Sequence, residues 1–437
     1  MSRHSCVLLA AALCAALLLG LAPMALSAPG SGPPPGWRQT AKNGIDNPNN
    51  TALFPFTCFN GRQYFWIPQT GDPQNAPAAP VWTYDGNKFV KAAPDGFGDP
   101  RNCSISPGSE FQGRFYLGTL NINGAQLWSS ADGLHFQQVG LATILAPGDY
   151  TCTPMGIQGG RLLVEIDNYN GSGCKVWAYD GTTFTRANTD GFGLNVQGLS
   201  SAVLFQGRIH VLSSSRQNQV NPLPEVALAY QGGTTWTPTA PEGFGDANNM
   251  GSYVAVTNGT YIYTGTDNQN GAQVWRFDGS SWTKVNIGAI GSPSNNMILV
   301  TLFKGKLMVA ATYLSQNGPP SRTAQIYVQK PDGSFGAISL DGFGDTNNLI
   351  LVLGPPHKRQ GAGGDRQHGR LPGLRDHQWP RHHRPGSGQR TLRHPCDHHR
   401  LRLRGRCGGL FRELRGGDSE FCQRRLLERH PDSGKSA

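Results

Sequence analysis

The chain lacks the short motifs that would identify a catalytic centre. Its 437 residues contain no Gly-rich phosphate loop that opens a helix, no Cys-x-x-Cys pair and no Gly-x-Ser-x-Gly nucleophile elbow. Between residues 36 and 354 the only cysteines are Cys58, Cys103, Cys152 and Cys174. The usual sequence evidence for a nucleotide-binding, thiol-redox or serine-hydrolase protein is therefore missing.

The last 83 residues, 355–437, contain no Val, Ile, Met, Asn or Tyr. They hold 19 of the 38 Lys and Arg residues and nine of the 12 His residues, against eight acidic residues. This tail carries a formal charge of +11, and the rest of the chain carries −1. Such a composition cannot bury a core and predicts a disordered, Arg/His-rich segment.

Three interpretations of the tail are open. It could bind nucleic acid or another acidic polymer, or it could bind a metal through His382, His383, His398 and His399 with Cys396 and Cys407. We favour a shifted reading frame near Leu353 to Pro356. Codons compatible with residues 361–380, read one base out of frame, permit a Thr-Asp-Asn and a Gln-Val-aromatic at the spacing seen in Thr266–Trp275. A nucleic-acid partner is therefore not expected.

What the chain does contain is a repeat, which covers residues 43 to about 350 with equivalent positions 45 to 52 residues apart. In the clearest copy, residues 243–282, the runs Ser252–Thr257 and Thr260–Thr266 flank Asn258-Gly259, which predicts a two-residue type I′ hairpin turn. Ala272–Phe277 and Ser280–Val285 follow as a third and a fourth strand. Each unit is therefore predicted to be a four-stranded antiparallel meander.

The copies keep the same register. The first turn recurs as Asn60-Gly61, Gln112-Gly113, Gly159-Gly160, Gln206-Gly207, Asn258-Gly259 and Lys304-Gly305. The third strand has a large side chain at one position, namely Trp82, Trp128, Trp177, Leu228, Trp275 and Tyr327. The next turn is Asp85-Gly86, Asp132-Gly133, Asp180-Gly181, Gln231-Gly232, Asp278-Gly279 and Asp332-Gly333. The connector to the next unit is Gly-Phe-Gly at residues 96–98, 191–193, 243–245 and 342–344, with a degenerate form at Gly44-Ile45-Asp46.

This pattern resembles the secreted bacterial β-propeller proteins of the kelch-like and Asp-box kind, over about residues 43 to 350. Ser130 to Phe136 resembles a loose Asp-box. The resemblance and the period imply an all-β fold, a β-propeller of four-stranded antiparallel blades. We expect about seven blades by design, the last one, which begins at Leu349–Leu353, being lost or disordered in this chain.

The sequence divides into four segments. Residues 1–27 have the charge and apolar pattern of a signal peptide, with cleavage expected after Ser27, although an uncleaved membrane anchor is the alternative. Residues 28–35 form a Pro/Gly linker, 36–354 the propeller repeats and 355–437 the tail. Gly36–Ala41 resembles a fourth strand, which would complete the last blade and close the ring. The mature protein is expected to be secreted, monomeric and free of the membrane.

Cysteines and acidic residues are the candidates for special chemistry. Because export favours disulfides, Cys152 and Cys174 are expected to pair, with buried free thiols as the alternative. Asp99, Asp246 and Asp345, with Asp149, offer the hard oxygens that calcium prefers. A feature that most blades share is more often a turn device, however, and we expect the Gly-Phe-Gly-Asp connectors and the repeated Trp residues to serve packing. No cofactor other than calcium is expected.

Ligand contacts are expected from the Thr-Asp-Asn loops, at Asp167, Asn168, Asp267 and Asn268. The polar residues that break the repeat are His210, Glu165, Tyr169, Glu225 and Arg216, and they form no recognisable nucleophile and base. We therefore expect a binding or interaction scaffold for a glycan or a cell-surface protein, a function that rests on analogy of fold. A secreted propeller enzyme acting on carbohydrate is the alternative.

Overall fold

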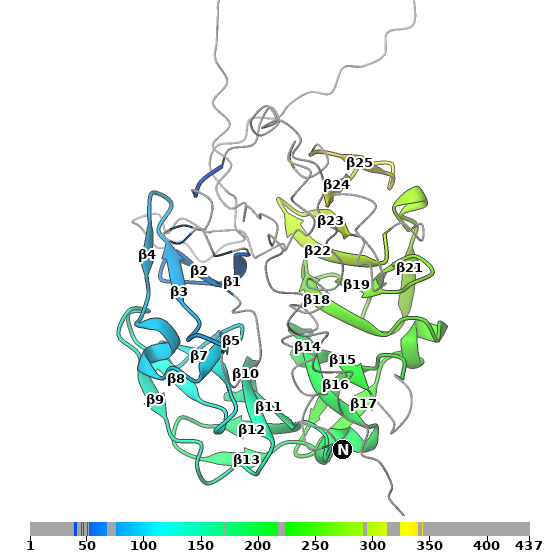
Figure 1. Cartoon of the computed structure of the whole chain (residues 1–437). Coiled ribbons are helices and arrows are strands. Elements are labelled where there is room, and N and C mark those ends of the chain that lie inside the picture. Colours follow the sequence, from blue (N-terminus) through cyan, green and yellow to red (C-terminus); the bar gives the residue numbers. More distant parts are fainter. Residues whose placement is uncertain are drawn as a thin grey trace, which may run out of the picture.

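The computed structural model describes residues 39–41, 45, 47, 50, 52–67, 76–168, 171–216, 223–291, 295–312, 324–339 and 343. Almost all regular structure in these residues is antiparallel β-sheet, built from six consecutive units that follow one another around a centre (Figure 1). The chain is a β-propeller, so the predicted all-β fold is confirmed.

The six units, here called blades 1 to 6, have four strands each in chain order, except that the first strand of blade 2 is broken in two. Blade 1 has β1 (Phe54–Phe59), β2 (Arg62–Trp66), β3 (Val81–Tyr84) and β4 (Phe89–Lys91). Blade 2 has β5 (Asn102–Ile105), β6 (Ser109–Phe111), β7 (Arg114–Asn121), β8 (Leu127–Ser130) and β9 (Gln137–Val139). Blade 3 has β10 (Asp149–Gln158), β11 (Arg161–Asn168), β12 (Lys175–Tyr179) and β13 (Phe184–Arg186).

The remaining blades repeat the same order. Blade 4 has β14 (Val196–Phe205), β15 (Arg208–Arg216), β16 (Ala227–Gly232) and β17 (Thr235–Pro238). Blade 5 has β18 (Gly251–Thr257), β19 (Ile262–Asp267), β20 (Val274–Phe277) and β21 (Trp282–Val285). Blade 6 has β22 (Met297–Phe303), β23 (Lys306–Thr312), β24 (Gln325–Gln329) and β25 (Phe335–Ala337). Within the described ranges four short 3₁₀ turns join these strands: η1 (Asp95–Gly98), η2 (Asp190–Gly193), η3 (Glu242–Gly245) and η4 (Gly288–Gly291).

Several predicted segments lie outside the described residues. These are the signal peptide, the linker, the seventh unit at Leu349–Leu353 and the tail. Of the predicted closing strand Gly36–Ala41 only residues 39–41 are described, and they form no strand. No helix among the described residues reaches the length and hydropathy that a membrane crossing requires.

The predicted type I′ turns are confirmed in five blades. In each of them both turn residues have positive φ, as at Asn60 (47°) and Gly61 (71°), which is the geometry of a type I′ hairpin. The prediction is wrong at Asn258-Gly259. There the loop spans residues 258–261, and Asn258 Oδ1 instead accepts hydrogen bonds from the backbone N–H groups of Thr260 and Tyr261. An Asx turn has replaced the two-residue turn.

The Gly-Phe-Gly connectors share one unusual backbone conformation. Gly96 and Phe97 have φ of 58° and 56°, and the same pair of positive φ angles recurs at Gly243 and Phe244. Left-handed φ is costly for a residue with a side chain. The offset is packing, because the ring of Phe97 stacks on that of Trp128 with centroids 5.0 Å apart. Connector and repeated Trp are thus structural, as predicted.

Adjacent blades are joined by a repeated backbone hydrogen bond. The N–H just before the third strand of one blade donates to a carbonyl at the start of the next blade, over 2.8 to 3.0 Å. The donor and acceptor pairs are Ala79 and Asn102, Ala125 and Asp149, Cys174 and Val196, Glu225 and Asn249, and Ala272 and Asn295. The residue that donates this bond packs closely against the next blade. A small side chain is therefore favoured at this position, which holds Ala in most blades.

The hydrophobic core is divided among the junctions between blades. One cluster of buried side chains lies between each of blades 1 and 2, 2 and 3, 3 and 4, and 5 and 6. Another cluster draws on both blade 1 and blade 6, with Phe343 among its members and Ile45 packed against it. Burial of apolar faces between sheets is therefore what holds the ring together.

Candidate functional site

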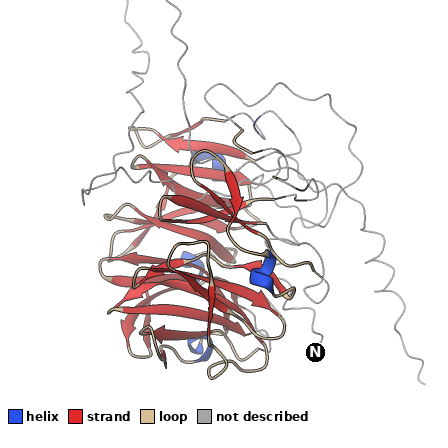
Figure 2. Cartoon of the chain, turned by 90° about the vertical axis from the view of Figure 1, so that its left-hand side faces the viewer, coloured by secondary structure: helices blue, strands red, loops and turns tan. Residues whose placement is uncertain are grey.

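The two faces of the propeller are built differently. In each blade the turns after the first and third strands lie at one face, called the hairpin face below. The loops after the second strand and the connectors between blades lie at the opposite face, called the connector face. The strands run side by side between these faces (Figure 2). The predicted site residues that the structure describes belong to the connector face or to strand ends beside it.

In blade 5 a network of amides surrounds the connector aspartate. Asp246 Oδ2 accepts hydrogen bonds from Asn268 Nδ2 at 3.1 Å and from Gln273 Nε2 at 2.7 Å. Asn249 Oδ1 accepts from Asn268 at 2.8 Å, and Gln273 Oε1 accepts from the indole of Trp275 at 3.0 Å. These bonds tie the connector, the second strand and the third strand of the blade together.

Blade 2 repeats this network with the same residue types. Asp99 Oδ2 accepts from Asn121 at 2.9 Å and from Gln126 at 2.6 Å. Asn102 Oδ1 accepts from Asn121 at 2.8 Å, and the Trp128 indole donates to Gln126 Oε1 at 3.1 Å. Recurrence with the same partners in two blades identifies the network as a feature of the scaffold.

The calcium prediction is not supported by these surroundings. Asp99 and Asp246 lie in different blades, and the groups pointing at them are N–H donors, whereas Ca²⁺ requires further oxygen ligands. Among the described residues no group of three or more His, Cys, Asp or Glu side chains is placed to hold a metal ion. Asp345 lies outside the described residues.

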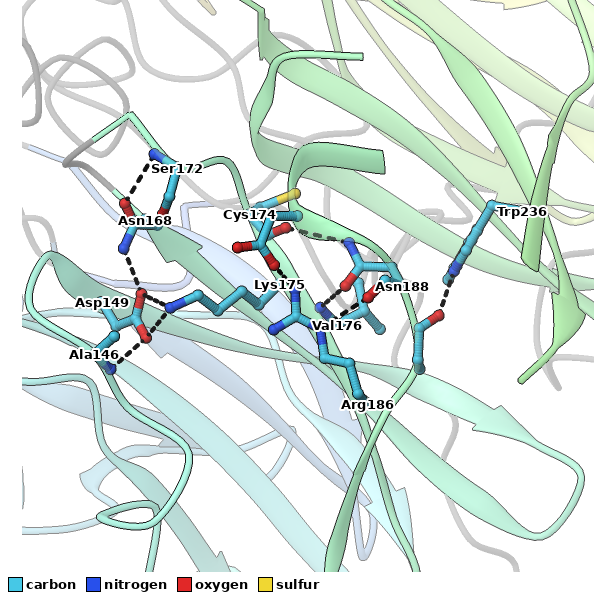
Figure 3. Close-up of polar contacts among 12 residues, drawn as sticks. Ala146, Asp149, Asn168, Ser172, Cys174, Lys175, Val176, Arg186, Asn188 and Trp236 are labelled. Atoms are coloured by element: carbon cyan, nitrogen blue, oxygen red, sulfur yellow. Dashed lines mark hydrogen bonds and ion pairs between the residues drawn. The ribbon is translucent and has the colours of Figure 1, made fainter. Parts of the chain in front are cut away.

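Blade 3 replaces the amide network with a buried ion pair (Figure 3). Asp149 stands where Asn249 stands in blade 5, and its carboxylate accepts from Asn168 Nδ2 at 2.7 Å. Lys175 takes the place of Gln273, and its Nζ lies 2.8 and 2.7 Å from the two carboxylate oxygens. The Lys175 side chain is 9% exposed and that of Asp149 0%. A buried ammonium without this carboxylate would be strongly unfavourable, so the two substitutions depend on each other.

The predicted disulfide is absent. Cys152 and Cys174 are both free and buried, and they lie in different core clusters, the first between blades 2 and 3 and the second between blades 3 and 4. Strand register explains this result: Cys152 pairs with Ile166, and Ile166 pairs with Lys175. Cys174 is one residue before Lys175, so its side chain points to the other face of the sheet. Burial raises the pKa of both thiols.

The predicted ligand contacts divide into two kinds. Asn168 and Asn268 are buried and belong to the scaffold networks described above. Asp167 is also buried, at the end of β11. Asp267, at the end of β19, is partly exposed and accepts a hydrogen bond from the phenol of Tyr253 at 3.2 Å. Burial raises the pKa of Asp267 to about 6, and the bond from Tyr253 opposes that rise.

Glu165 is the first of two buried glutamates at positions where some other blades have small residues. Strand register places it where blades 2 and 5 have Gly118 and Gly265. A Cβ at Gly118 would lie 1.8 Å from the carbonyl oxygen of Cys152 in the next blade, so no side chain fits there. In blade 3 the side chain is accommodated, and Glu165 Oε1 accepts from the backbone N–H of Leu199 at 2.5 Å.

The carboxyl of Glu165 lies against that of Asp167, two residues along the same strand face. Burial raises the pKa of Glu165 well above its usual range, and the adjacent Asp167 raises it further. Two carboxyl groups in contact can form a hydrogen bond only if one of them holds a proton. At neutral pH we therefore expect Glu165 and Asp167 to share one proton.

Glu225 is the second such glutamate. It precedes the third strand of blade 4, at the position that holds Ala79, Ala125, Cys174 and Ala272 in other blades. The side chain is 1% exposed, and neither carboxyl oxygen has a hydrogen-bond partner of acceptable geometry within the described part of the chain. Burial raises the pKa of Glu225 to about 8, and the nearby Ser252 hydroxyl opposes that rise.

Among the other irregular polar residues, His210 is the one whose side chain the structure describes. His210 lies between the rings of Phe205 and Phe277, and burial lowers its pKa to about 4. It is therefore a neutral packing residue at physiological pH. Tyr169 and the side chain of Arg216 lie outside the described residues. Sequence reasoning had singled out Glu165 and Glu225 but missed Lys175, whose signal is a lysine at the position that holds Gln126, Gln273 and Gln325 in three other blades.

Comparisons with known proteins give matches in structure only. No protein-family profile matches the chain, and no curated protein matches its sequence. Among solved structures, a GH74 enzyme from Niastella koreensis aligns with a TM-score of 0.45 and 13% identity over 67% of this chain and 46% of that chain. The match thus spans less than half of that enzyme.

Two further solved structures are similar to the chain. The fucose-specific lectin from Aleuria aurantia aligns at a TM-score of 0.41 and 11% identity, over 68% of this chain and 97% of the lectin. The β-propeller domain of the Trilobed protease from Pyrococcus furiosus aligns at 0.41 and 11%, over 66% of this chain and 85% of that domain.

Proposed function

We propose that this protein is a binding scaffold whose connector face holds an extracellular ligand, most simply a glycan, with a cell-surface protein as the other partner class. It carries out no chemistry in this proposal. The location outside the cell rests on the signal-peptide pattern of residues 1–27.

The observation that carries the proposal is a difference in loop length between the two faces. At the hairpin face the first turn has two residues in five blades and four in blade 5. At the connector face the segments between the second and third strands, some of whose residues lie outside the described part of the chain, are 67–80, 122–126, 169–174, 217–226, 268–273 and 313–324, from 5 to 14 residues. The turns after the third strand, also at the hairpin face, have two to six residues, so segment length varies more at the connector face. Segments of variable length on one face of a rigid repeat are typical of a binding surface.

Asp267 is the group best placed to contact a polar ligand on this face. It lies directly before the 268–273 loop, it is partly exposed, and one of its oxygens already accepts from Tyr253. Carboxylate oxygens accept strong hydrogen bonds from hydroxyl donors. A sugar ring supplies such donors in adjacent pairs, which is the reason for placing glycans first.

Binding can be tested with the full chain on a glycan array, followed by calorimetric titration of the best ligand. We expect Asp267→Asn to weaken binding about tenfold, since a charge-assisted hydrogen bond contributes about 1.5–3 kcal/mol. Lys88→Ala, an exposed change in a hairpin-face turn, serves as the control and should leave affinity within about twofold. Failure of every glycan and every tested surface protein to bind would refute the proposal.

A second function, carbohydrate hydrolysis, is favoured by one specific observation. Glu225 and Asp267 act on each other electrostatically, and burial raises the pKa of the first to about 8 and of the second to about 6. Two carboxyls with unequal proton affinity are what acid and base catalysis requires. Release of product from a polysaccharide panel, lost in Glu225→Gln, would establish this function in place of the first.

A further inference from the structure

Each of the five junctions between consecutive described blades contains the same pair of facing positions. One is the small residue before the third strand of a blade, and the other is a residue of the first strand of the next blade. In four junctions the pair is apolar and belongs to a common core cluster: Ala79 with Ile105, Ala125 with Cys152, Cys174 with Leu199, and Ala272 with Ile298.

Blades 4 and 5 are the exception, because both members of the pair are polar. Glu225 faces Ser252, whose register partner Thr266 fixes it at the same position as Cys152 and Ile298. Ser252 Oγ is buried and, like both carboxyl oxygens of Glu225, lacks a hydrogen-bond partner of acceptable geometry within the described residues. The two substitutions replace an apolar contact with polar atoms that are poorly satisfied.

The surrounding core is also weaker at this junction. The other clusters have ten to twelve buried residues each, whereas here two separate clusters have three each. One contains Phe205, Ile262 and Phe277, and the other contains Leu212, Ala227 and Phe244. Less buried apolar surface means less free energy opposing separation of these two blades.

The charged groups around Glu225 do not stabilise its ionised form. Within the described residues the charged side chain that acts on Glu225 is Asp267, which follows Thr266, the register partner of Ser252. Both carboxyls also act electrostatically on the phenol of Tyr253. All three are acidic. Ionisation of Glu225 in the closed junction therefore places a negative charge in a buried site beside another, and no cation among the described side chains compensates it.

We propose that the junction between blades 4 and 5 is a proton-controlled opening point of the ring, closed while Glu225 is protonated and loosened when it ionises. This device goes beyond the proposed binding function and does not depend on which ligand is bound. Opening separates β14 from β18 and gives water access to the Glu225 carboxyl and the Ser252 hydroxyl.

The direction of the pH dependence follows from linkage. The carboxyl of Glu225 has a pKa of about 8 in the closed state, against 4.5 when exposed, so the open state releases the proton more readily. Opening is thus favoured by rising pH through this interval, about tenfold per pH unit, and levels off above pH 8. Burial raises the pKa of Asp267 to about 6. Ionisation of Asp267 therefore favours opening with rising pH only below pH 6. From pH 6 to 8 the contribution of Asp267 is small. Glu165 also has a raised pKa and accepts a hydrogen bond from Leu199 of β14, so the part due to Glu225 is the part that Glu225→Gln removes.

Hydrogen–deuterium exchange of the full chain, corrected for intrinsic rates, measures this opening. In peptides covering β14 and β18 we expect the opening equilibrium to rise about a hundredfold from pH 6 to 8. In Glu225→Gln the rise should vanish. Glu225→Ala, which restores the residue of the other blades, provides a second variant and should also abolish it.

Two controls separate this device from general alkaline loosening. Peptides covering β7 and β10, at the junction of blades 2 and 3, should show no comparable rise. Glu110→Gln removes an exposed carboxylate and should leave the β14 and β18 profile unchanged. An equal rise in wild type and Glu225→Gln, or an equal rise at both junctions, would overturn the proposal.

Discussion

At the scale of single residues, departures from the repeat come as pairs. Asp149 and Lys175 replace the Asn and Gln of blade 5, and Glu225 and Ser252 replace an apolar pair. Asp149 and Lys175 form a short ion pair with each other. The carboxyl oxygens of Glu225 and the hydroxyl of Ser252, in contrast, lack a hydrogen-bond partner within the described residues. Paired substitutions in the same repeat can therefore form a structural feature in one blade and a sensitive one at another junction.

The pairing of Asp149 and Lys175 predicts a specific double-mutant cycle. Lys175→Gln leaves the buried carboxylate of Asp149 without its cation and should lower the free energy of unfolding by about 3–5 kcal/mol. Adding Asp149→Asn restores the residue types of blade 5 and should recover most of that loss. Urea unfolding at pH 7 measures both variants. If the double variant is as unstable as Lys175→Gln alone, the proposed equivalence of the two blades is wrong.

The free state of Cys152 and Cys174 gives a second expected result. Both thiols are buried and have raised pKa values, so alkylation of the native chain should leave both unmodified. In denaturant without a reductant both should react fully, as read by peptide mass spectrometry. Detection of two peptides linked through Cys152 and Cys174 would show that the disulfide predicted from the sequence does form.

Residue-level features were the least predictable from the sequence. Side chains on adjacent residues of a strand point to opposite faces, so Cys174 beside Lys175 already argued against a bond to Cys152. Glu165 and Glu225 were recognisable as irregular, but their burial depends on backbone approaches between blades, such as the closeness of Cys152 to Gly118. That information is absent from spacing alone.

At the scale of elements, the connectors show how strain and packing balance. Phe97 keeps a left-handed φ because its ring stacks on Trp128 and packs against Phe136 at 5.1 Å. The two glycines that flank Phe97, Gly96 and Gly98, differ in what surrounds them. At Gly96 the next blade approaches closely, whereas at Gly98 no atom lies within 4 Å of an added Cβ.

This contrast predicts different costs for the same substitution. Gly98→Ala should lose roughly 1–2 kcal/mol of stability from left-handed backbone strain alone. Gly96→Ala adds contacts at 3.0 Å with Ala78 and 3.1 Å with Asn102, and overpacking should cost roughly another 1–3 kcal/mol. Thermal unfolding of the two variants measures the difference. Equal losses would show that the junction between blades 1 and 2 is looser than described.

Elements themselves were predicted well, since their signals are local. Turn pairs ending in Gly set the hairpins, and alternating apolar residues set the strands. The failure at Asn258-Gly259 has a local cause too, because the Asn258 side chain competes for the backbone donors of Thr260 and Tyr261.

At the scale of the whole molecule, the repeat period was sufficient to predict a β-propeller, because one blade cannot bury its two faces alone. Six blades lie within the described residues, and the cluster shared by blades 1 and 6 joins the ends of that series. The seventh unit, the frameshift and secretion stay predictions. What the period cannot give is the ligand, which depends on loops and irregular side chains instead of the repeat.

The most direct test of the account is hydrogen–deuterium exchange of the full chain with and without its best glycan-array ligand. We predict that the ligand slows exchange only in connector-face peptides, in particular those covering 122–126 and 268–273. The hairpin-face turns at 60–61 and 304–305 should be unchanged. Protection at those turns, with none at the connector face, would contradict the assignment of the binding surface.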